Sequence, residues 1–340
     1  MRKSFESLFE VETIPGLGQI TATEILNAGI SNIETGTDFV RFRYDGAINK
    51  LAQFKTAVSV YALLRYDVPR PRALLGHQHF TRLTNSIQAV LAVEKSSYST
   101  FNLNAAGSDS SVMNRIKQAI TEATGLQNSD TGGDLFVRIR RHKPGWDVLI
   151  RLTPRPLSTR FWRICDYEGA LNAPVAHAMV IMSQPSADQA VLNIGCGSAS
   201  IMIERFVADT AKQLVGIDNA PHALDCASHN LIAAAALDHT HLIKGDARSL
   251  PFMSRSFDTL LADLPFGQRI GSHENNQTLY PEILNEAARV ARHHARFVLI
   301  THEIRLMSET IRHSNIWALE REIKINLRGL HPRIYILRRS

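Results

Sequence analysis

Residues 190–339 alternate short apolar runs with segments of helical character, and no other feature of the chain constrains its fold as strongly. Strands that alternate with helices form a mostly parallel sheet with helices packed on its faces. The last two apolar runs are joined by only a short turn, so we expect them to pair as an antiparallel hairpin. The expected strands are 190–194, 214–218, 241–246, 257–263, 296–302, 317–326 and 332–339, and the expected helices are 200–210, 220–237 and 279–291.

The preceding residues predict a separate α+β region of shorter elements. With 340 residues, the chain is long enough for two or three domains. Strand-like runs occupy 8–13, 39–44 and 58–68, a hairpin is expected from 135–140 to 146–152, and helical periodicity covers 16–28, 81–93 and 109–124. In the last of these helices, Asp109 or Ser110 is available as the N-cap.

Charge is distributed unevenly between the two halves. Residues 1–165 hold 21 Lys and Arg against 14 Asp and Glu, whereas residues 166–340 hold 17 against 18. Arginine outnumbers lysine by 29 to 9, and guanidinium groups make planar, bidentate contacts with phosphate. A basic front half followed by a neutral rear half favours a polyanion-binding region joined to a second activity. A basic surface that is merely solvated remains the alternative.

Composition excludes several classes of protein. The hydrophobic fraction of 44% excludes a disordered, collagen-like or coiled-coil chain. Cys165, Cys196 and Cys226 are too few for a disulfide framework and include no C-x-x-C pair, which favours a reducing setting. The start of the sequence has no apolar run typical of a signal peptide, and residues 169–187 suit a buried helix better than a membrane span. We therefore expect a soluble cytoplasmic protein. The histidines lack acids or thiols at ligand spacing, so we expect no metal site.

The segment VLNIGCGSASIMIE (191–204) lies where an expected strand passes into a helix. Gly195 and Gly197 allow the backbone to approach a ligand closely, and a helix that begins near Ser200 directs free amide groups toward that ligand. Taken alone, a tight structural turn explains this pattern about as well. Cys196, within the loop, is interpreted as a small packed residue rather than a nucleophile.

Two acids follow at the ends of the next two expected strands. Asp218 closes the second strand, 21 residues after Gly197, where comparable folds hold a pair of ribose hydroxyls. Asp246 lies at the tip of the third strand, where its carboxylate can accept a hydrogen bond from the exocyclic amine of an adenine. The glycine loop and the two acids together predict a nucleotide-type site much more specifically than any one of them.

The fourth expected strand ends in DLPFG (263–267). An acid or amide, a proline and an aromatic residue at this place are typical of methyltransferases that act on planar amino groups. The Asp263 carboxylate and nearby backbone carbonyls can hold an exocyclic NH₂ group, and Phe266 can stack on the base. A dehydrogenase that uses a nicotinamide cofactor has no use for this element, and a proline-containing loop is the structural alternative.

Together these segments resemble the THUMP-domain tRNA guanine-N2 methyltransferases. The resemblance is carried by residues 131–163, 167–180, 263–284 and 329–339. It implies an α/β chain whose Rossmann-like class I methyltransferase domain has a mostly parallel seven-stranded sheet with an antiparallel terminal hairpin, preceded by an α+β ferredoxin-like and THUMP region. The implied domains are a ferredoxin-like segment at 1–60, a THUMP-like RNA-binding domain at 61–155, a linker at 156–185 and the methyltransferase domain at 186–340.

The resemblance also implies a function and a set of site residues. The implied enzyme uses S-adenosylmethionine to form N2-methylguanosine at position 6 of the tRNA acceptor stem, with the acceptor stem and 3′ end of tRNA as its partner, and we expect a monomer. The implied cofactor residues are Leu171, Asn172, Asn193, Gly195, Gly197, Asp218, Asn219, Asp246, Ala247 and Asp263. Asp263, Pro265 and Phe266 are the implied catalytic residues, the carboxylate and the carbonyls of Leu264 and Pro265 orienting the amino group. Arg151, Arg155, Arg160 and Arg163 are expected to contact RNA phosphates.

Three departures from the family pattern are visible. Asn193 stands where the family usually has Asp, Ala199 where glycine is usual, and Leu264 where the common form has its first proline. The departures at Asn193 and Ala199 leave open one alternative, an RNA-binding protein with impaired catalysis. An amino-methyltransferase that acts on another base, on rRNA or on a glutamine amide is the second alternative. Tyr280 and Pro281 are interpreted as the start of the helix that follows the substrate loop.

Overall fold

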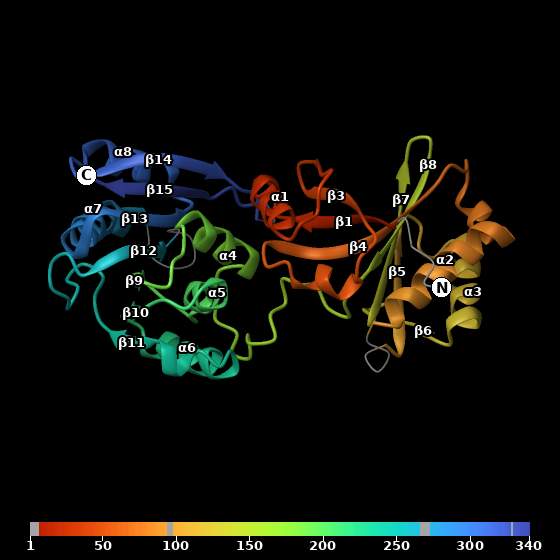
Figure 1. The fold of residues 1–340 in the computed structure, drawn as a ribbon, viewed down its shortest axis with the longest axis horizontal. Helices are drawn as coiled ribbons and strands as arrows, with labels where there is room; N and C mark the ends of the chain where they lie inside the picture. The colour runs from red at the N-terminus through yellow and green to blue at the C-terminus, as the bar shows by residue number, and fades with distance from the viewer. Residues whose placement is uncertain (1–6, 94–97, 266–272, 328) are drawn as a thin grey trace. The chain divides into compact units, whose positions relative to one another are not determined.

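The computed structural model describes residues 7–93, 98–265, 273–327 and 329–340. The chain divides into two compact units, whose elements are labelled in Figure 1. Unit 1 comprises the described residues up to Thr13 together with those of Gly18–Ser158, and unit 2 comprises Ile14–Leu17 with the described residues of Thr159–Ser340.

Unit 1 contains an eight-stranded mixed sheet with the strand order β2-β3-β1-β4-β8-β7-β5-β6. Its strands are β1 (Ser7–Thr13), β2 (Glu34–Thr35), β3 (Phe39–Tyr44), β4 (Ala57–Tyr66), β5 (Thr100–Ala105), β6 (Gln127–Asn128), β7 (Leu135–His142) and β8 (Gly145–Arg151). β5 pairs in parallel with β6 and β7, and the other pairs are antiparallel. The hairpin expected from the sequence is formed by β7 and β8.

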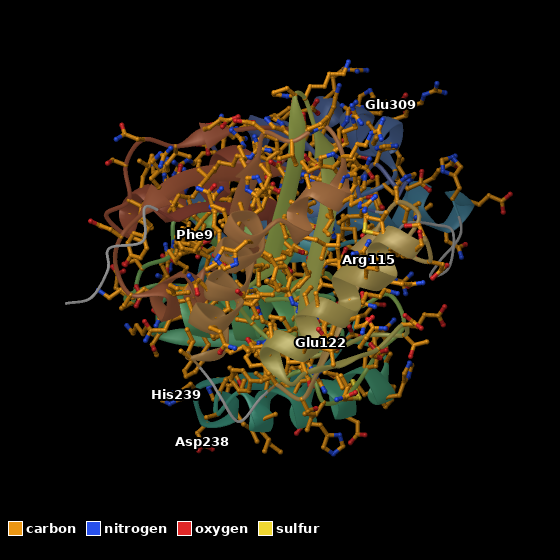
Figure 2. All side chains as sticks on the ribbon, turned by 90° about the vertical axis from the view of Figure 1, so that its right-hand side faces the viewer. Phe9, Arg115, Glu122, Asp238, His239 and Glu309 are labelled. Atoms are coloured by element: carbon orange, nitrogen blue, oxygen red, sulfur yellow. A yellow bond between two sulfur atoms is a disulfide. The ribbon has the colours of Figure 1, made fainter. Side chains whose placement is uncertain are left out.

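The helices α1 (Gly18–Asn27), α2 (His77–Leu91) and α3 (Ser111–Thr124) place their apolar residues in one core with the sheet. Short 3₁₀ turns lie at Ile48–Gln53 and Pro71–Leu75. Ser110 caps α3, as the sequence indicates, because its hydroxyl accepts a hydrogen bond from the Met113 amide at 3.4 Å. Phe9 on β1 is buried, whereas Arg115 and Glu122 lie on the exposed side of α3 (Figure 2).

The boundary expected at residue 60 falls inside β4. This strand pairs with β1 along one edge and with β8 along the other, so the residues before and after the boundary share one sheet and one core. β-branched and aromatic residues mark a strand in the sequence, but they do not say which strands it will pair with. The division into ferredoxin-like and THUMP segments remains a prediction.

Unit 2 contains a seven-stranded sheet with the strand order β11-β10-β9-β12-β13-β15-β14. Its strands are β9 (Ala190–Ile194), β10 (Gln213–Asp218), β11 (His241–Lys244), β12 (Phe257–Asp263), β13 (Ala291–Thr301), β14 (Trp317–Lys324) and β15 (Arg333–Arg339). The first five strands of this order are parallel, and β15 and β14 form an antiparallel hairpin beside β13. The predicted parallel sheet and its closing hairpin are therefore confirmed.

Helices cover both faces of this sheet. They are α4 (Ala173–Met182), α5 (Ser200–Ala208), α6 (Pro221–Ala233), α7 (His273–Val290) and α8 (Ile304–His313), with a short 3₁₀ turn at Leu237–His239. Apolar residues of α7 and α8 belong to one core with Leu192 and Ile194 of β9. α5 lies on the other face of the sheet. A Cβ at Gly216 of β10 would clash with the Met202 sulfur of α5. The residues on either side of Gly216 point to the opposite face, into the core that contains α7. None of the helices in the described ranges is long and apolar enough to cross a membrane.

Tyr280 and Pro281 do not start a helix as the sequence suggested. α7 begins at His273, so both residues lie about two turns inside it, and Pro281 interrupts its hydrogen-bond ladder. Proline is common in the first turn of helices, which explains the interpretation. The buried side chains of Asn276 and Tyr280 show why the helix begins earlier: both are held by tertiary contacts.

Candidate active site

The loop after β9 brings its backbone close to the end of β12. Gly195 and Gly197 adopt left-handed conformations, with φ of +62° and +52°, which glycine accommodates easily. A Cβ at position 195 would lie 3.8 Å from the backbone oxygen of Asp263, so two of the predicted site segments are adjacent. Ala199 also has a positive φ of +66° before α5 begins, which costs a residue with a Cβ about 1 kcal/mol.

Asp218, at the end of β10, is fixed by two backbone amides. One carboxylate oxygen accepts from the Gly197 amide and the other from the Ala220 amide, both at 2.9 Å. Each oxygen keeps a further lone pair for a ligand hydroxyl. Asn219, the next residue, is exposed.

Asp246 follows β11 and is paired with a neighbour. Both of its carboxylate oxygens accept from the Arg248 guanidinium, one of them at 2.7 Å from an Nη atom, and one also accepts from the Arg248 amide. These hydrogen bonds and the guanidinium charge lower the pKa of Asp246. An adenine amine would therefore have to share this carboxylate with Arg248. Ala247, between the two, is half-buried.

Two buried amide oxygens near the start of the site have no hydrogen-bond partner among the residues that the structure describes. Asn193 lies in β9, where its Nδ2 donates to the Leu261 carbonyl at 3.1 Å, and its Oδ1 is unpaired. Asn172 immediately precedes α4, and its Oδ1 is buried and unpaired as well. A buried oxygen without a donor is costly, and a bound ammonium or N–H group would satisfy it.

Arg163 ties the segment before α4 to the segment after the glycine loop. One of its Nη atoms donates to the Leu171 carbonyl at 2.8 Å and to the Ser200 hydroxyl at 3.0 Å. Leu171 itself is buried. The guanidinium thus has a positioning role inside unit 2, which differs from the RNA contact expected for Arg163.

Tyr167 belongs to the site although sequence reasoning did not select it. A Cβ on Gly197 would lie 4.0 Å from the Tyr167 ring, and that ring packs against His222 with centroids 5.4 Å apart. Burial, followed by the nearby Asp218 and Cys196, raises the pKa of Tyr167. The one signal in the sequence was its position at the head of the motif-bearing segment 167–180.

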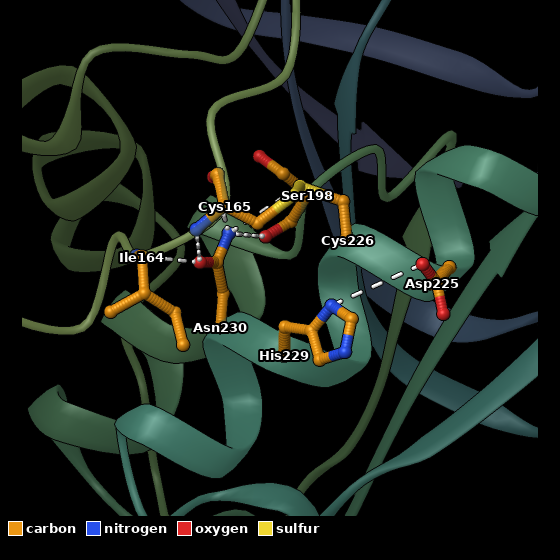
Figure 3. The surroundings of a disulfide bond; sticks show 7 residues. All are labelled: Ile164, Cys165, Ser198, Asp225, Cys226, His229 and Asn230. Atoms are coloured by element: carbon orange, nitrogen blue, oxygen red, sulfur yellow. Dashed lines mark hydrogen bonds and ion pairs between the residues drawn. A yellow bond between two sulfur atoms is a disulfide. The ribbon is translucent and has the colours of Figure 1, made fainter.

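A disulfide and a buried asparagine fix the chain just before Tyr167 (Figure 3). Cys165 is bonded to Cys226 of α6 across 61 residues of sequence. Asn230, one turn further along α6, accepts from the Ile164 and Cys165 amides and donates to the carbonyls of Cys165 and Ser198. The cysteine count excluded a disulfide framework, and the structure contains this single bridge, because folding brings together two cysteines that are far apart in sequence.

Asp263 ends β12, as predicted, and its surroundings favour the protonated acid. Burial raises the pKa of Asp263 to about 7. The segment that follows is held from two sides, since the Leu264 amide donates to the Ile300 carbonyl at 3.0 Å and α7 side chains bind the Pro265 carbonyl. Phe266 lies outside the described residues.

The remaining predicted RNA contacts divide into buried and exposed groups. Arg160 is buried and pairs with Glu204 at 2.7 Å, and His177 also binds that carboxylate at 2.9 Å. Burial raises the pKa of Glu204, but the His177 and Arg160 contacts outweigh it and lower the pKa. Arg151 is buried too and donates to the Thr153 and Pro154 carbonyls. These placements correct the phosphate-binding expectation for Arg151 and Arg160, because buried guanidiniums are not presented to RNA. Arg155 is exposed.

The residues at this edge fit a cofactor with a ribose and a methionine-like amino group. Asp218 suits the hydroxyl pair of a ribose, and the unpaired oxygens of Asn172 and Asn193 suit an ammonium. The glycine loop allows close approach. Among the described residues, no group of three or more His, Cys, Asp or Glu side chains is arranged to hold a metal ion.

The strand order, the antiparallel hairpin and the glycine loop followed by Asp218 define the class I S-adenosylmethionine-dependent methyltransferase fold. Residues 160–333, just over half of the chain, match the UPF0020 family, described as the RMKL-like methyltransferase domain. The chain therefore belongs to this family of methyltransferase domains.

Several curated relatives are named as guanine-N2 methyltransferases. The mouse tRNA (guanine(6)-N(2))-methyltransferase THUMP3 is 26% identical over 224 residues, covering 62% of this chain and 44% of that protein. The Methanocaldococcus jannaschii tRNA (guanine(6)-N2)-methyltransferase is 27% identical over 218 residues, covering 53% and 57%. The mouse U6 snRNA (guanine-N(2))-methyltransferase THUMPD2 is 30% identical over 156 residues, covering 46% and 28%. The chain spans about half the length of the curated relatives it matches first.

Solved structures share the fold over nearly the whole chain. TrmN from Thermus thermophilus superposes with a TM-score of 0.78 at 21% identity, covering 98% of this chain and 100% of that one. SMU.472 in complex with SAH superposes with a TM-score of 0.72 at 14% identity, covering 97% of both chains. Because these sequence identities are low, the structural likeness establishes a shared fold and not a shared function.

Proposed function

We propose that this chain transfers a methyl group from S-adenosylmethionine to N2 of a guanosine in tRNA, at position 6 of the acceptor stem. Membership in a methyltransferase domain family supports the reaction type, and the names of the mouse and archaeal relatives support the substrate. The observation that carries the proposal is Asp263, which ends β12 next to the glycine loop and is followed by Leu264 and Pro265.

When bound, S-adenosylmethionine supplies a methyl group on a sulfonium, so the protein needs little acid–base chemistry. Its task is to align the nucleophilic nitrogen and to exclude water. The guanine amino group carries two hydrogens, which the Asp263 carboxylate and the Leu264 carbonyl would accept. These acceptors also disperse the positive charge that develops on the nitrogen, and the Asp263 carboxylate can take the proton that the nitrogen must lose to give the neutral product. The target base must leave the stem before its amino group can reach this edge of the sheet.

The Pro265 carbonyl was expected to accept a hydrogen bond from the substrate amino group, and we assign it a different role. Its carbonyl oxygen already accepts hydrogen bonds from Tyr280 and Asn276, which use both of its lone pairs. The amino group is therefore assigned to Asp263 and Leu264 alone. Stacking of the base on Phe266 remains a prediction.

Unit 1 is the proposed tRNA-binding part, which would hold the acceptor stem and 3′ end. Its excess of arginine supports binding to phosphates, and Arg155 is exposed at its carboxyl end. Such a unit would select the position of the guanosine by distance rather than by reading bases. We further propose a cytoplasmic monomer.

Methylation of bulk tRNA from a host that lacks the modification tests the proposal. The expected product, identified by nucleoside mass spectrometry, is N2-methylguanosine, and fragment mapping should place it at position 6. Any other methylated nucleoside would refute the base assignment. The similarity to the U6 snRNA enzyme supports one second candidate, guanine-N2 methylation of another RNA, so a U6 snRNA transcript is the parallel substrate.

The non-catalytic alternative is tested separately. Equilibrium dialysis with labelled S-adenosylmethionine separates an enzyme from an RNA-binding protein that has lost its cofactor site. We expect saturable binding at one site per chain. Absence of binding would favour the alternative suggested by Asn193 and Ala199.

A further inference from the structure

Two side chains of α7 converge on the carbonyl oxygen of Pro265. Asn276 and Tyr280 lie four residues apart, on one face of the helix, and both are completely buried. The Asn276 Nδ2 donates to the Pro265 oxygen at 3.1 Å, and the Tyr280 hydroxyl lies 2.6 Å from the same oxygen. The Tyr280 hydroxyl is also 2.6 Å from the hydroxyl of Thr301, at the end of β13.

The chemistry of these groups fixes the direction of every hydrogen bond. A carbonyl oxygen only accepts, so the Tyr280 hydroxyl must donate its single proton to Pro265. The hydroxyl of Thr301 must then be the donor to the Tyr280 oxygen. Thr301 in turn accepts from the Glu303 amide at 3.0 Å. The result is a directed chain from a backbone amide through two hydroxyls to the substrate segment.

This chain of hydrogen bonds immobilises the residues after Asp263. The Pro265 ring fixes one backbone torsion, the two α7 donors hold the Pro265 carbonyl, and the Leu264 amide is held by Ile300. With both lone pairs occupied, the Pro265 oxygen is closed to a substrate amine. Desolvation raises the pKa of Tyr280, so the hydroxyl keeps the proton that it donates.

We propose that Asn276 and Tyr280 are positioning residues for methyl transfer, which saturate the Pro265 carbonyl so that a substrate amino group is received only by Asp263 and the Leu264 carbonyl. This inference rests on the proposed function and assigns a task to residues outside the motifs. An amine that could also bind Pro265 would have two alternative poses, of which only one directs the nitrogen lone pair at the methyl group.

The main variant is Tyr280→Phe, which removes one hydroxyl and keeps the ring. The kcat of tRNA methylation should fall 10- to 100-fold, whereas the KM for tRNA and the Kd for S-adenosylhomocysteine change less than threefold. Tyr335→Phe is the matched control. Tyr335 is an equally buried tyrosine of unit 2, whose hydroxyl donates to the Ile304 carbonyl at 3.5 Å and not to Pro265. It should lose comparable thermal stability but keep its kcat.

A pair of variants at position 301 tests the direction of the hydrogen bonds. Thr301→Val removes the donor to Tyr280 with little change of shape and should lower kcat as Tyr280→Phe does. Thr301→Ser should restore most of the lost rate, because serine keeps the hydroxyl. A kcat within twofold of wild type in both Tyr280→Phe and Thr301→Val would overturn the proposal, and so would a loss that appears in the Kd for S-adenosylhomocysteine.

A measurement without turnover separates this inference from the proposed function. Hydrogen exchange of the Leu264 amide should be at least tenfold faster in Tyr280→Phe than in wild type or Tyr335→Phe. If the wild-type chain methylates no guanosine but this difference is found, the proposed function fails and the positioning network stands. Equal exchange rates in the three proteins would overturn the network.

Discussion

The carboxylate of Asp218 accepts a hydrogen bond from the backbone amide of Gly197 at 2.9 Å, joining two motif residues that are 21 positions apart. The contact ties the end of β10 to the loop after β9. It makes the acid a part of the loop's structure as well as the proposed ligand for a ribose. Two of the segments selected from the sequence are thus coupled before any cofactor binds.

Replacing Asp218 with alanine should weaken binding of S-adenosylhomocysteine at least tenfold, about 1.4 kcal/mol, because both the ribose acceptor and the loop anchor are lost. Isothermal titration calorimetry measures the change. Asp225→Ala is the control, since Asp225 is an exposed acid on α6. The binding of tRNA should be the same in both variants. An unchanged affinity for S-adenosylhomocysteine in Asp218→Ala would show that the ribose assignment is wrong.

Replacing Asp263 with alanine should abolish methyl transfer, because the acceptor for the amino group is lost, and replacing it with asparagine should stabilise the fold at alkaline pH. Burial raises the pKa of Asp263 from 3.8 to about 7 in the folded chain. The folded state therefore binds more protons than the unfolded state between about pH 4 and 7, and the free energy of unfolding falls as the pH rises through that range. An asparagine side chain does not titrate, so Asp263→Asn keeps its free energy of unfolding as the pH rises through that range.

At pH 8 we expect Asp263→Asn to unfold with a free energy at least about 1 kcal/mol above wild type, and near pH 4 the two should differ little. Urea titrations at both pH values measure this. In the wild-type enzyme, kcat should rise as the pH passes through about 7, because the carboxylate is the acceptor form. A methylation rate above one tenth of wild type in Asp263→Ala would remove Asp263 from its assigned role.

Reduction of the Cys165–Cys226 disulfide should lower the free energy of unfolding by about 2 to 4 kcal/mol, since the bond closes a long loop within unit 2. Because Tyr167 lies two residues after Cys165, the affinity for S-adenosylhomocysteine should fall as well. Thermal unfolding with and without dithiothreitol measures the first effect. The Cys165→Ser, Cys226→Ser double variant should match the reduced wild type and ignore the reductant. A response of the double variant to dithiothreitol would contradict this explanation.

Charge reversal should affect Arg155 and Arg160 in different ways. Arg160→Glu leaves Glu204 buried without its cation, so unfolding should become easier by about 3 to 5 kcal/mol. Arg155→Glu changes an exposed side chain, so stability should stay the same while tRNA binding weakens and the slope of log K against log salt decreases by about 1. Filter binding across a salt series and thermal unfolding separate the two. A tRNA affinity unaffected by Arg155→Glu would remove that residue from the proposed surface.

Much of the fold followed from short-range patterns. The runs at 190–194 and 257–263 became β9 and β12 with the expected bounds, because apolar runs between helical segments report burial locally. The sequence also predicted that Asp218 and Asp263 lie at the carboxyl ends of their strands, at the same edge of the sheet, because parallel strands end at one edge.

Other features depended on contacts between residues far apart in the chain. The bridge from Cys165 to Cys226, the burial of Arg160 against Glu204 and the position of Tyr167 beside Gly197 leave no periodic trace in the sequence. A basic residue near a domain boundary looks the same whether it meets a phosphate or a buried carboxylate.

The sequence by itself determined the order of strands and helices in unit 2 and the chemistry placed at the strand ends, because both arise from residues that are neighbours along the chain. Only the tertiary structure decided which of those polar groups remain available. It closed the Pro265 carbonyl with Asn276 and Tyr280 and drew Arg160 inward, because a buried hydrogen-bonding group must find its partner wherever packing puts one.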